Sequence, residues 1–232
     1  MRQVDARQEA GQVQTDDADG HQKAKHGLLM TSARIAEKSI LIARHGETID
    51  NERGLIVGHR DPPVSEIGRE QAARLAARVR GVDIVAIWTS PLLRARQTAS
   101  FVTEAIGVEP TVLADLIESD RGFWEGQSIA HIAEVSPELH AAFEAGDLDF
   151  AFPGGESLRA QVERTRRALA LVAAGPGPAL VVAHAGTIRA ALLALGRRPP
   201  PERALPHGDV VLLRWGSGGA GGLEPAGTVP GL

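Results

Sequence analysis

Short apolar runs alternate along the chain with longer stretches in which apolar and polar residues mix. The apolar runs predict five strands, at 40–43, 83–88, 111–113, 179–183 and 210–215. Apolar residues at helical spacing predict helices over 68–80, 91–106, 127–145 with a break at Pro137, 156–174, and from after Gly186 to about 195. Strands that alternate with helices predict an α/β fold, a three-layer α/β/α sandwich around a mostly parallel central sheet.

The two ends of the chain and one internal segment lack these patterns. Residues 1–37 are rich in Gln, Asp, Ala and Gly, and they predict a disordered extension. Residues 216–232 are rich in Gly and predict a flexible tail, so we expect one domain over 38–215. Residues 50–63 predict a loop, because Gly, Pro, Asn and Asp dominate there. Met30 lies just ahead of the first strand, and we hypothesise that translation begins there, so that residues 1–29 are not part of the native protein.

The composition narrows the classes of function. The 232 residues carry a formal net charge of −4 and contain no cysteine. A mildly acidic chain is not typical of nucleic-acid binding, and the lack of cysteine excludes disulfides, thiolate metal ligands and a cysteine nucleophile. No apolar run approaches the roughly 20 residues of a membrane span, and residues 27–30 are too short a run for a secretory signal. We therefore expect a cytoplasmic protein that binds neither nucleic acid nor a membrane.

Polar residues follow three of the predicted strands at the point where each strand ends. Arg44 and His45 follow the first, Arg94 lies in the helix after the second, and His184 follows the fourth. In an open α/β sheet the carboxyl ends of the strands are where ligands bind. Neutral imidazole is a nucleophile and a guanidinium can fork onto phosphoryl oxygens, so this inventory suits phosphoryl transfer. A loop at 116–126 adds a carboxylic acid, Glu118.

Five segments, in chain order, resemble the motifs of the histidine phosphatase superfamily, the phosphoglycerate mutase-like clan. They are ARHGETIDN from Ala43, SPLLRARQTA from Ser90, IESDRGFWEG from Ile117, FPGGESL from Phe152 and VVAHAGTIRA from Val181. The matches cover about 39–190, and their compact pattern is similar to branch 1 members such as α-ribazole phosphatases and broad-specificity phosphatases. The resemblance implies a phosphoglycerate mutase-like fold for the domain.

By position, the resemblance also implies the roles of individual residues. It implies that His45 attacks phosphorus and becomes a phosphohistidine, and that Glu118 is the general acid. It implies that the phosphoryl oxygens are held by Arg44, Arg94 and His184. Further candidates for substrate binding are Gly46, Thr48, Asn51, Gly58, His59, Arg121, Ala185 and Gly186. The mechanism implied by the resemblance needs neither a metal ion nor another cofactor.

Several candidate residues have a second interpretation. Arg121 stands where relatives commonly carry an aromatic or apolar residue, and it either reaches the substrate or is solvated. His59 either lines the mouth of the pocket or is an exposed loop histidine. Arg96 is expected to be a solvated helix residue, and Trp124 to pack rather than stack on substrate. Three other histidines are expected at the surface or partly buried rather than as ligands: His131, His140 and His207.

The superfamily contains both phosphatases and mutases, so the reaction depends on the segment over the site. That segment, 121–152, contains one arginine, no lysine and six acids, and it would repel a highly anionic substrate. We therefore expect hydrolysis of a small phosphorylated metabolite. The alternative is a bisphosphoglycerate-dependent phosphoglycerate mutase; a more distant one is a non-catalytic module that binds a phosphorylated ligand. The resemblance is compatible with a homodimer.

Overall fold

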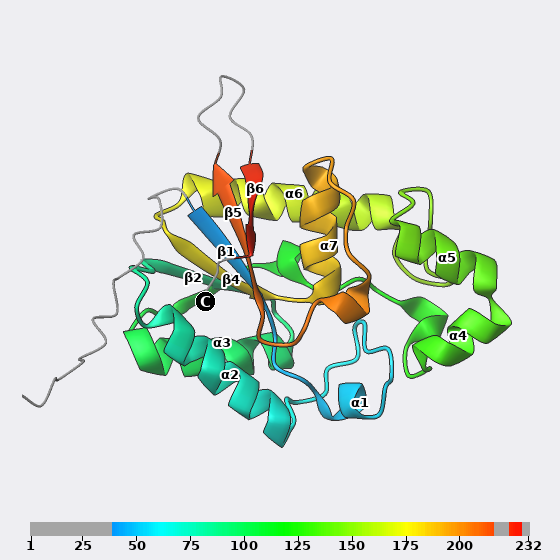
Figure 1. Cartoon of the computed structure of the whole chain (residues 1–232), viewed down its shortest axis with the longest axis horizontal. Coiled ribbons are helices and arrows are strands. Elements are labelled where there is room, and N and C mark those ends of the chain that lie inside the picture. Colours follow the sequence, from blue (N-terminus) through cyan, green and yellow to red (C-terminus); the bar gives the residue numbers. More distant parts are fainter. Residues whose placement is uncertain (1–38, 216–222, 229–232) are drawn as a thin grey trace, which may run out of the picture. The chain divides into compact units, whose positions relative to one another are not determined.

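A six-stranded sheet forms the centre of the protein, in a computed structural model that describes residues 39–215 and 223–228. Its order is β3-β2-β4-β1-β5-β6 (Figure 1). The strands are β1 Ser39–Arg44, β2 Ala86–Thr89, β3 Pro110–Val112, β4 Ala179–Ala183, β5 Val210–Trp215 and β6 Leu223–Thr228. The first four strands pair in parallel, whereas β5 runs antiparallel to β1 and β6 runs antiparallel to β5.

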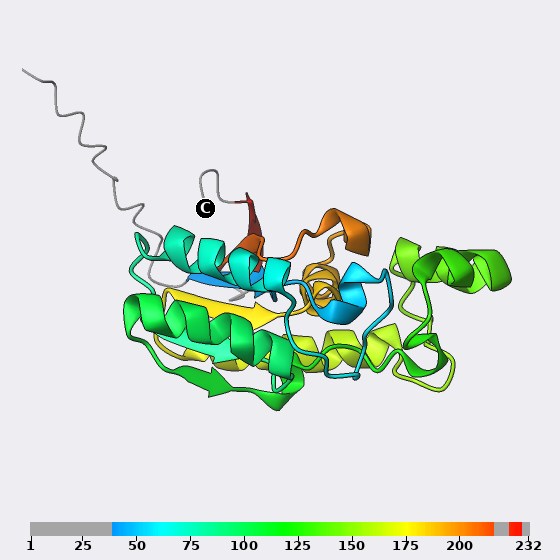
Figure 2. The same cartoon turned by 90° about the horizontal axis from the view of Figure 1, so that it is seen from below.

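Helices cover both faces of the sheet, as a three-layer sandwich requires. The α-helices are α1 Ile49–Glu52, α2 Glu66–Val79, α3 Leu93–Ile106, α4 Ile129–Val135, α5 Pro137–Ala145, α6 Leu158–Ala174 and α7 Ala185–Ala194. Short 3-10 helices are η1 Ala114–Leu116, η2 Gly122–Trp124 and η3 Glu202–Ala204. Helices α2 and α3 lie on one side of the sheet and α6 and α7 on the other (Figures 1 and 2). The predicted α/β/α sandwich with a mostly parallel sheet is thus confirmed.

The alternation of side chains along the strands produces two cores. Leu41 and Ala43 of β1 point into the cluster shared with α2 and α3, and Ile40 and Ile42 point into the cluster shared with α6 and α7. All four side chains are buried, which explains why β1 reads as a continuous apolar run rather than an alternating one. Both faces of the central strand are therefore covered.

A third cluster of aromatic side chains holds α4 and α5, which lie beyond the sheet layers (Figure 1). Trp124, Phe143, Phe150 and Phe152 pack edge to face or tilted, with ring centroids 4.8 to 5.9 Å apart. Trp124 is buried among them, so the prediction that it packs is confirmed. This cluster fixes the segment that covers the carboxyl end of the sheet.

Two predictions about the loops and ends are wrong. The predicted loop over 50–63 begins with α1, because the Thr48 side chain and the Asn51 side chain form a reciprocal capping box that starts a short helix. The predicted flexible tail contains β6, because the antiparallel edge of β5 offers backbone groups with which Leu223–Thr228 pairs. The predicted extension over 1–37 and the remainder of the tail lie outside the described residues. In the part of the chain that the structure describes, no helix combines the length and apolar character needed to cross a membrane.

Candidate active site

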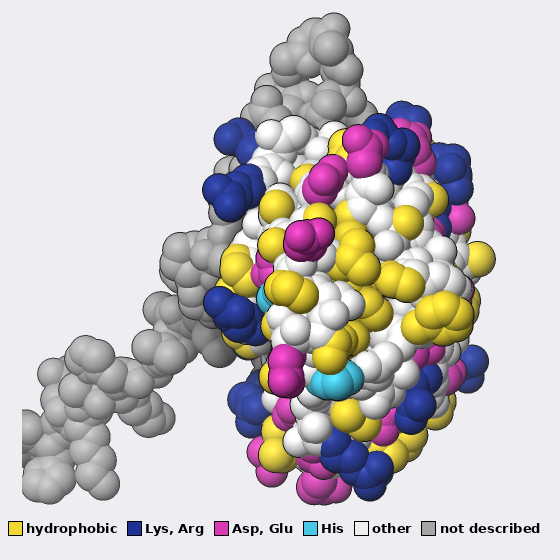
Figure 3. All heavy atoms as spheres, turned by 90° about the vertical axis from the view of Figure 1, so that its right-hand side faces the viewer, with side chains coloured by type: hydrophobic (Ala, Val, Ile, Leu, Met, Phe, Trp, Pro, Cys, Tyr) yellow, Lys and Arg dark blue, Asp and Glu magenta, His cyan; other side chains and the backbone are white. Residues whose placement is uncertain are grey.

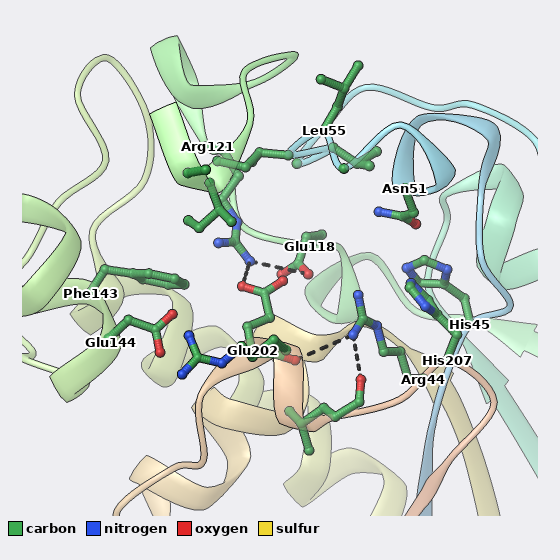
Figure 4. Close-up of a pocket in the computed structure, with 18 of the residues that line it drawn as sticks. Arg44, His45, Asn51, Leu55, Glu118, Arg121, Phe143, Glu144, Glu202 and His207 are labelled. Atoms are coloured by element: carbon green, nitrogen blue, oxygen red, sulfur yellow. Dashed lines mark hydrogen bonds and ion pairs between the residues drawn. The ribbon is translucent and has the colours of Figure 1, made fainter. Parts of the chain in front are cut away.

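A cavity of about 500 Å³ opens where β1 ends (Figure 4). Its inner end is formed by residues at the end of β1, in α3 and just before β5, and its outer end by the loop after α1, by α4 and α5, and by η3. The predicted site residues that line it are Arg44, His45, Asn51, Gly58, Arg94, Glu118 and Arg121. Segments separated by more than 100 positions thus meet in one pocket.

His45 is a neutral imidazole with one nitrogen engaged by the backbone. Its Nδ1 lies 2.7 Å from the carbonyl oxygen of Gly46, and because a carbonyl only accepts, this nitrogen carries the proton. The lone pair therefore resides on Nε2. Burial, and then the positive charge of Arg94, hold the pKa of His45 well below its ordinary value. The ring can act as a nucleophile at neutral pH.

The guanidinium of Arg94 lies beside the imidazole of His45. Its Nε lies 3.3 Å from His45 Nε2, and its two terminal nitrogens donate to the carbonyl oxygens of Gly58 and Arg60, each at 2.8 Å. Gly58 has a φ of +57°, and a Cβ there would lie 2.1 Å from a carboxylate oxygen of Glu125. Glycine at this position therefore lets the loop after α1 approach closely enough to orient Arg94.

A second histidine, His184, and a second arginine, Arg44, lie close to His45. The His184 ring centroid lies 5.1 Å from that of His45, and its Nε2 lies 2.7 Å from the Ser90 hydroxyl oxygen. Burial holds the pKa of His184 well below its ordinary value, with Arg94 as the largest charge contribution, so this ring is also neutral. Arg44 lines the cavity and donates to the backbone oxygen of Leu205. Two guanidiniums beside neutral imidazoles form a site suited to a phosphoryl group.

His207 was expected at the surface or partly buried and not as a ligand; it is partly buried, but it lies at the site. His140, of which the same was expected, also lines the cavity. The His207 ring lines the cavity, and its centroid lies 5.4 Å from that of His45. Burial, Arg44 and Arg94 lower its pKa to about 3. The reason is topological: β5 runs antiparallel to β1, so its amino end lies beside the carboxyl end of β1, and Ala43 pairs with Val210. A residue three positions before Val210 therefore reaches the site.

Glu118 is a buried carboxylate, 5% exposed, that accepts hydrogen bonds from three directions. The Ser119 backbone N–H lies 2.8 Å from its Oε1, the Gln161 amide 3.2 Å from Oε1, and the Gly186 backbone N–H 3.2 Å from Oε2. A Cβ at Gly186 would lie 2.1 Å from Oε1, so glycine is needed for this approach. The start of α7 thus positions the acid rather than lining the cavity.

Arg121 lines the cavity but is not solvated. It is 3% exposed, and one guanidinium nitrogen lies 3.5 Å from Glu118 Oε2 and 3.1 Å from Glu202 Oε2. The solvated alternative is wrong, because Arg121 is held between two carboxylates. Arg96, two residues after Arg94, is exposed as predicted.

Six predicted residues do not line the cavity: Gly46, Thr48, His59, His184, Ala185 and Gly186. The Gly46 N–H donates to the Thr98 hydroxyl, and Thr48 caps α1. His59 is exposed, and its Nε2 donates to the backbone oxygen of Glu118 at 2.9 Å. These residues lie around the site without lining the cavity, and contact between them and a substrate stays a prediction. Asn51 lies at the wall with its amide nitrogen turned toward the cavity (Figure 4).

The fold and the site together define an α/β protein whose buried histidines and arginines meet where the parallel strands end. The chain belongs to the histidine phosphatase superfamily, branch 1, because the model of that family matches residues 40–221. Members of this superfamily are phosphatases or mutases. Over residues 39–215 and 223–228, the side chains of His, Cys, Asp and Glu form no group of three or more that could hold a metal ion.

Two relatives and one solved structure are similar to this chain. "Bifunctional protein Rv2228c" of Mycobacterium tuberculosis is 35% identical over 187 residues, which cover 79% of this chain and 49% of that protein. The chain therefore spans about half the length of that relative. "Probable phosphoglycerate mutase GpmB" of Salmonella choleraesuis is 33% identical over 131 residues, 56% of this chain and 61% of that one. The solved structure of a mycobacterial glucosyl-3-phosphoglycerate phosphatase has a TM-score of 0.71 and 28% identity, and covers 82% of this chain and 97% of that one.

Proposed function

We propose that this chain is a phosphoric monoester hydrolase that acts through a phosphohistidine on His45. The observation that carries the proposal is the His45 ring, neutral, with its Nδ1 proton held by the Gly46 carbonyl and its Nε2 beside the guanidinium of Arg94. Nucleophilic catalysis requires a nitrogen that carries no proton, and phosphoryl transfer requires fixed positive charge around the phosphoryl oxygens. Both requirements are met at the same end of the cavity.

The steps of the reaction follow from these positions. The Nε2 lone pair of His45 forms a bond to phosphorus while the bond to the ester oxygen breaks, and Arg44 and Arg94 neutralise the phosphoryl oxygens. Glu118, protonated, gives its proton to the leaving oxygen. Water then attacks phosphorus and gives a proton to the Glu118 carboxylate, and the bond to Nε2 breaks with return of its electron pair. The products are the alcohol and inorganic phosphate.

The outer end of the cavity supports hydrolysis of a substrate with one phosphate. Apolar side chains dominate it, among them Leu55, Ile129 and Phe143, and hydrophobic groups also gather on the outer face over α4 and α5 (Figure 3). Among the residues that line the cavity, Glu144 and Glu202 add negative charge, and Arg203 is an exposed arginine. Arg121 is already paired with two carboxylates. A second phosphate or carboxylate on the substrate would find little positive charge here.

The alternative reaction is phosphoglycerate mutation, and the relative named as a phosphoglycerate mutase favours it. The two reactions differ in the fate of the phosphoryl group, which is passed to water by a phosphatase and to a second hydroxyl by a mutase. A mutase of this kind requires bisphosphoglycerate to charge its histidine. The acidic outer cavity supports the first reaction over the second.

The experiment measures phosphate release from a panel of phosphomonoesters beside a coupled assay for isomerisation of 3-phosphoglycerate to 2-phosphoglycerate, with and without bisphosphoglycerate. We expect release without isomerisation, and loss of release in His45→Ala but not in the exposed His131→Ala. Isomerisation that depends on bisphosphoglycerate would establish the mutase instead. The metal-free mechanism predicts unchanged activity in EDTA; activity lost in EDTA and restored by a divalent cation would contradict it.

A further inference from the structure

One guanidinium nitrogen of Arg121 lies between two carboxylates from distant parts of the chain (Figure 4). It is 3.1 Å from Glu202 Oε2, within hydrogen-bond distance, and 3.5 Å from Glu118 Oε2, which is longer than an ordinary N–H···O bond. Glu118 lies in the loop before η2, and Glu202 begins η3. The side chain of Glu202 is 26% exposed, whereas those of Glu118 and Arg121 are almost fully buried. The Arg121 guanidinium thus pairs with two carboxylates, one buried and one partly exposed to solvent.

The environment of Arg121 confines its guanidinium to these two partners. The guanidinium carbon lies 5.1 Å from the ring centroid of Phe143 and 4.8 Å from that of Phe152. Its backbone N–H donates to Glu125 Oε1 at 3.2 Å. Aromatic faces attract a cation but offer it no counter-ion, so the guanidinium must be neutralised by Glu118, by Glu202 or by both. A small shift of the guanidinium redistributes its charge between them.

The state of Glu118 in the free protein conflicts with a role as an acid. Burial raises its pKa, but Arg121, the Ser119 N–H, Arg94 and the Gly186 N–H together lower it to about 2. At that pKa the carboxyl carries almost no proton at neutral pH, although the proposed reaction requires it to donate one. Something in the site must weaken the stabilisation of the anion when substrate is present.

We propose that Arg121 and Glu202 are positioning residues that control the protonation of Glu118, with Glu202 taking over the Arg121 cation as Glu118 takes up a proton. This inference rests on the proposed function. The substrate phosphoryl group brings negative charge next to Arg44 and Arg94, which disfavours a second anion at Glu118. A proton from solvent then enters Glu118, and Arg121 pairs with Glu202. When the ester bond breaks, the proton moves to the leaving oxygen and Arg121 again pairs with both acids.

The other charged groups around Glu118 do not perform this exchange. Arg44 and Arg94 are oriented by backbone oxygens, and Arg189 of α7 donates to the backbone oxygens of Phe143 and Glu144. Glu202 is the acid that pairs with the same nitrogen of Arg121 as Glu118 does. Four arginines on the elements around Glu118 interact with its charge: Arg44, Arg94, Arg121 and Arg189. Glu202 acts on Glu118 through its ion pair with Arg121.

The test compares two esters whose leaving groups differ in their need for a proton. An alkyl phosphate releases an alkoxide and requires the acid, whereas p-nitrophenyl phosphate requires it much less. The readout is the ratio of kcat/KM for the alkyl ester to that for the aryl ester, measured across the acidic and neutral range. The variants are Arg121→Gln and Glu202→Gln, and the control is Glu138→Gln. Glu138 lies on α5 with an exposed side chain, and it is not among the residues that line the cavity.

The two variants should move the ratio in opposite directions. Arg121→Gln removes the cation that stabilises the Glu118 anion, so the ratio rises about tenfold for each pKa unit by which Glu118 recovers. The decline of alkyl ester activity with rising pH also moves to higher pH. In Glu202→Gln, Arg121 pairs with Glu118 alone, so the ratio falls by about tenfold for each unit by which the pKa of Glu118 drops. Glu138→Gln leaves the ratio nearly unchanged.

A purely structural role would lower both activities equally and leave the ratio unchanged in both variants, which would overturn the inference. A fall of the ratio in Arg121→Gln would do the same. If Arg121→Gln does not fold, Glu202→Gln decides alone, because its side chain is partly exposed. Failure of the proposed function looks different: wild-type protein would then release no phosphate from p-nitrophenyl phosphate, or would release it equally well as His45→Ala.

Discussion

The Nε of Arg94 lies 3.3 Å from the Nε2 of His45, with both side chains buried at the inner end of the cavity. The two residues come from α3 and from the end of β1, and neither neighbours the other in sequence. In the proposed reaction, a phosphoryl oxygen at this position would accept the Arg94 Nε–H in place of His45 Nε2. The proximity also disfavours protonation of His45, because a guanidinium repels an imidazolium.

Replacement of Arg94 by Gln should lower kcat/KM for phosphomonoesters by about 10²–10³, since the loss of one fixed donor to a developing charge has this cost. The matched control is Arg96→Gln on the same helix, where the side chain is exposed. Thermal unfolding distinguishes two causes of the lower activity. An unchanged Tm points to the lost charge, and a lowered Tm points to the lost hydrogen bonds with the loop at Gly58 and Arg60. Equal activity of the two variants would contradict the role of Arg94.

Glu118→Gln should slow alkyl phosphates by about 10²–10⁴ and p-nitrophenyl phosphate far less, because the amide cannot donate the proton that an alkoxide needs. Steady-state kinetics on the two esters measures the difference. The control, Glu138→Gln, lies on α5 with an exposed side chain. Equal losses on both esters would exclude Glu118 as the acid.

Acidification should destabilise the fold through its buried histidines. The pKa of His207 is lowered to about 3, so the folded state binds this proton less readily than the unfolded chain, whose histidines titrate near pH 6.5. The stabilisation is complete above about pH 6.5 and decreases by roughly 1 kcal/mol per pH unit as the pH falls toward the folded pKa. Urea unfolding at a series of pH values measures this slope.

His207→Gln should reduce that slope, whereas His131→Gln, at an exposed position, should leave it unchanged. His45 and His184 have lowered pKa values for the same reason and add to the slope in both variants. A His207→Gln slope equal to that of the wild type would show that this histidine is protonated in the folded state.

Gly46→Ala should destabilise the protein by roughly 1–3 kcal/mol, the usual cost of inserting a methyl group into a packed site. The added Cβ would lie 2.3 Å from the backbone oxygen of Gly68, where the start of α2 contacts the turn after β1. At Gly81 the same addition meets no atom within 4 Å, so Gly81→Ala is the control. Denaturant unfolding measures the difference, and equal midpoints for the two variants would refute the packing argument.

The strands, most helix boundaries and the residues around His45 could be predicted from the sequence, because each depends on neighbours in the chain. Ser65 accepts a hydrogen bond from the Gly68 N–H at 3.1 Å and caps α2, as its position three residues earlier indicates. Pro137 separates α4 from α5 because it cannot continue a helix from Val135 without loss of a backbone donor. Such local rules operate before any tertiary contact forms.

The partners of Arg121 and the place of His207 were decided by tertiary structure alone. Glu118 and Arg121 are three positions apart, but Glu202 reaches the same nitrogen from 81 positions away. The segment that carries Glu202, η3, contacts α7, so the tertiary fold brings this carboxylate to Arg121. His207 enters the site because β5 pairs antiparallel with β1. The sequence by itself determined the strands, the order of the motifs and the reactive residue types, since these follow from local periodicity and side-chain chemistry. Strand direction and long-range ion pairs depend on contacts between distant segments, which local patterns do not encode.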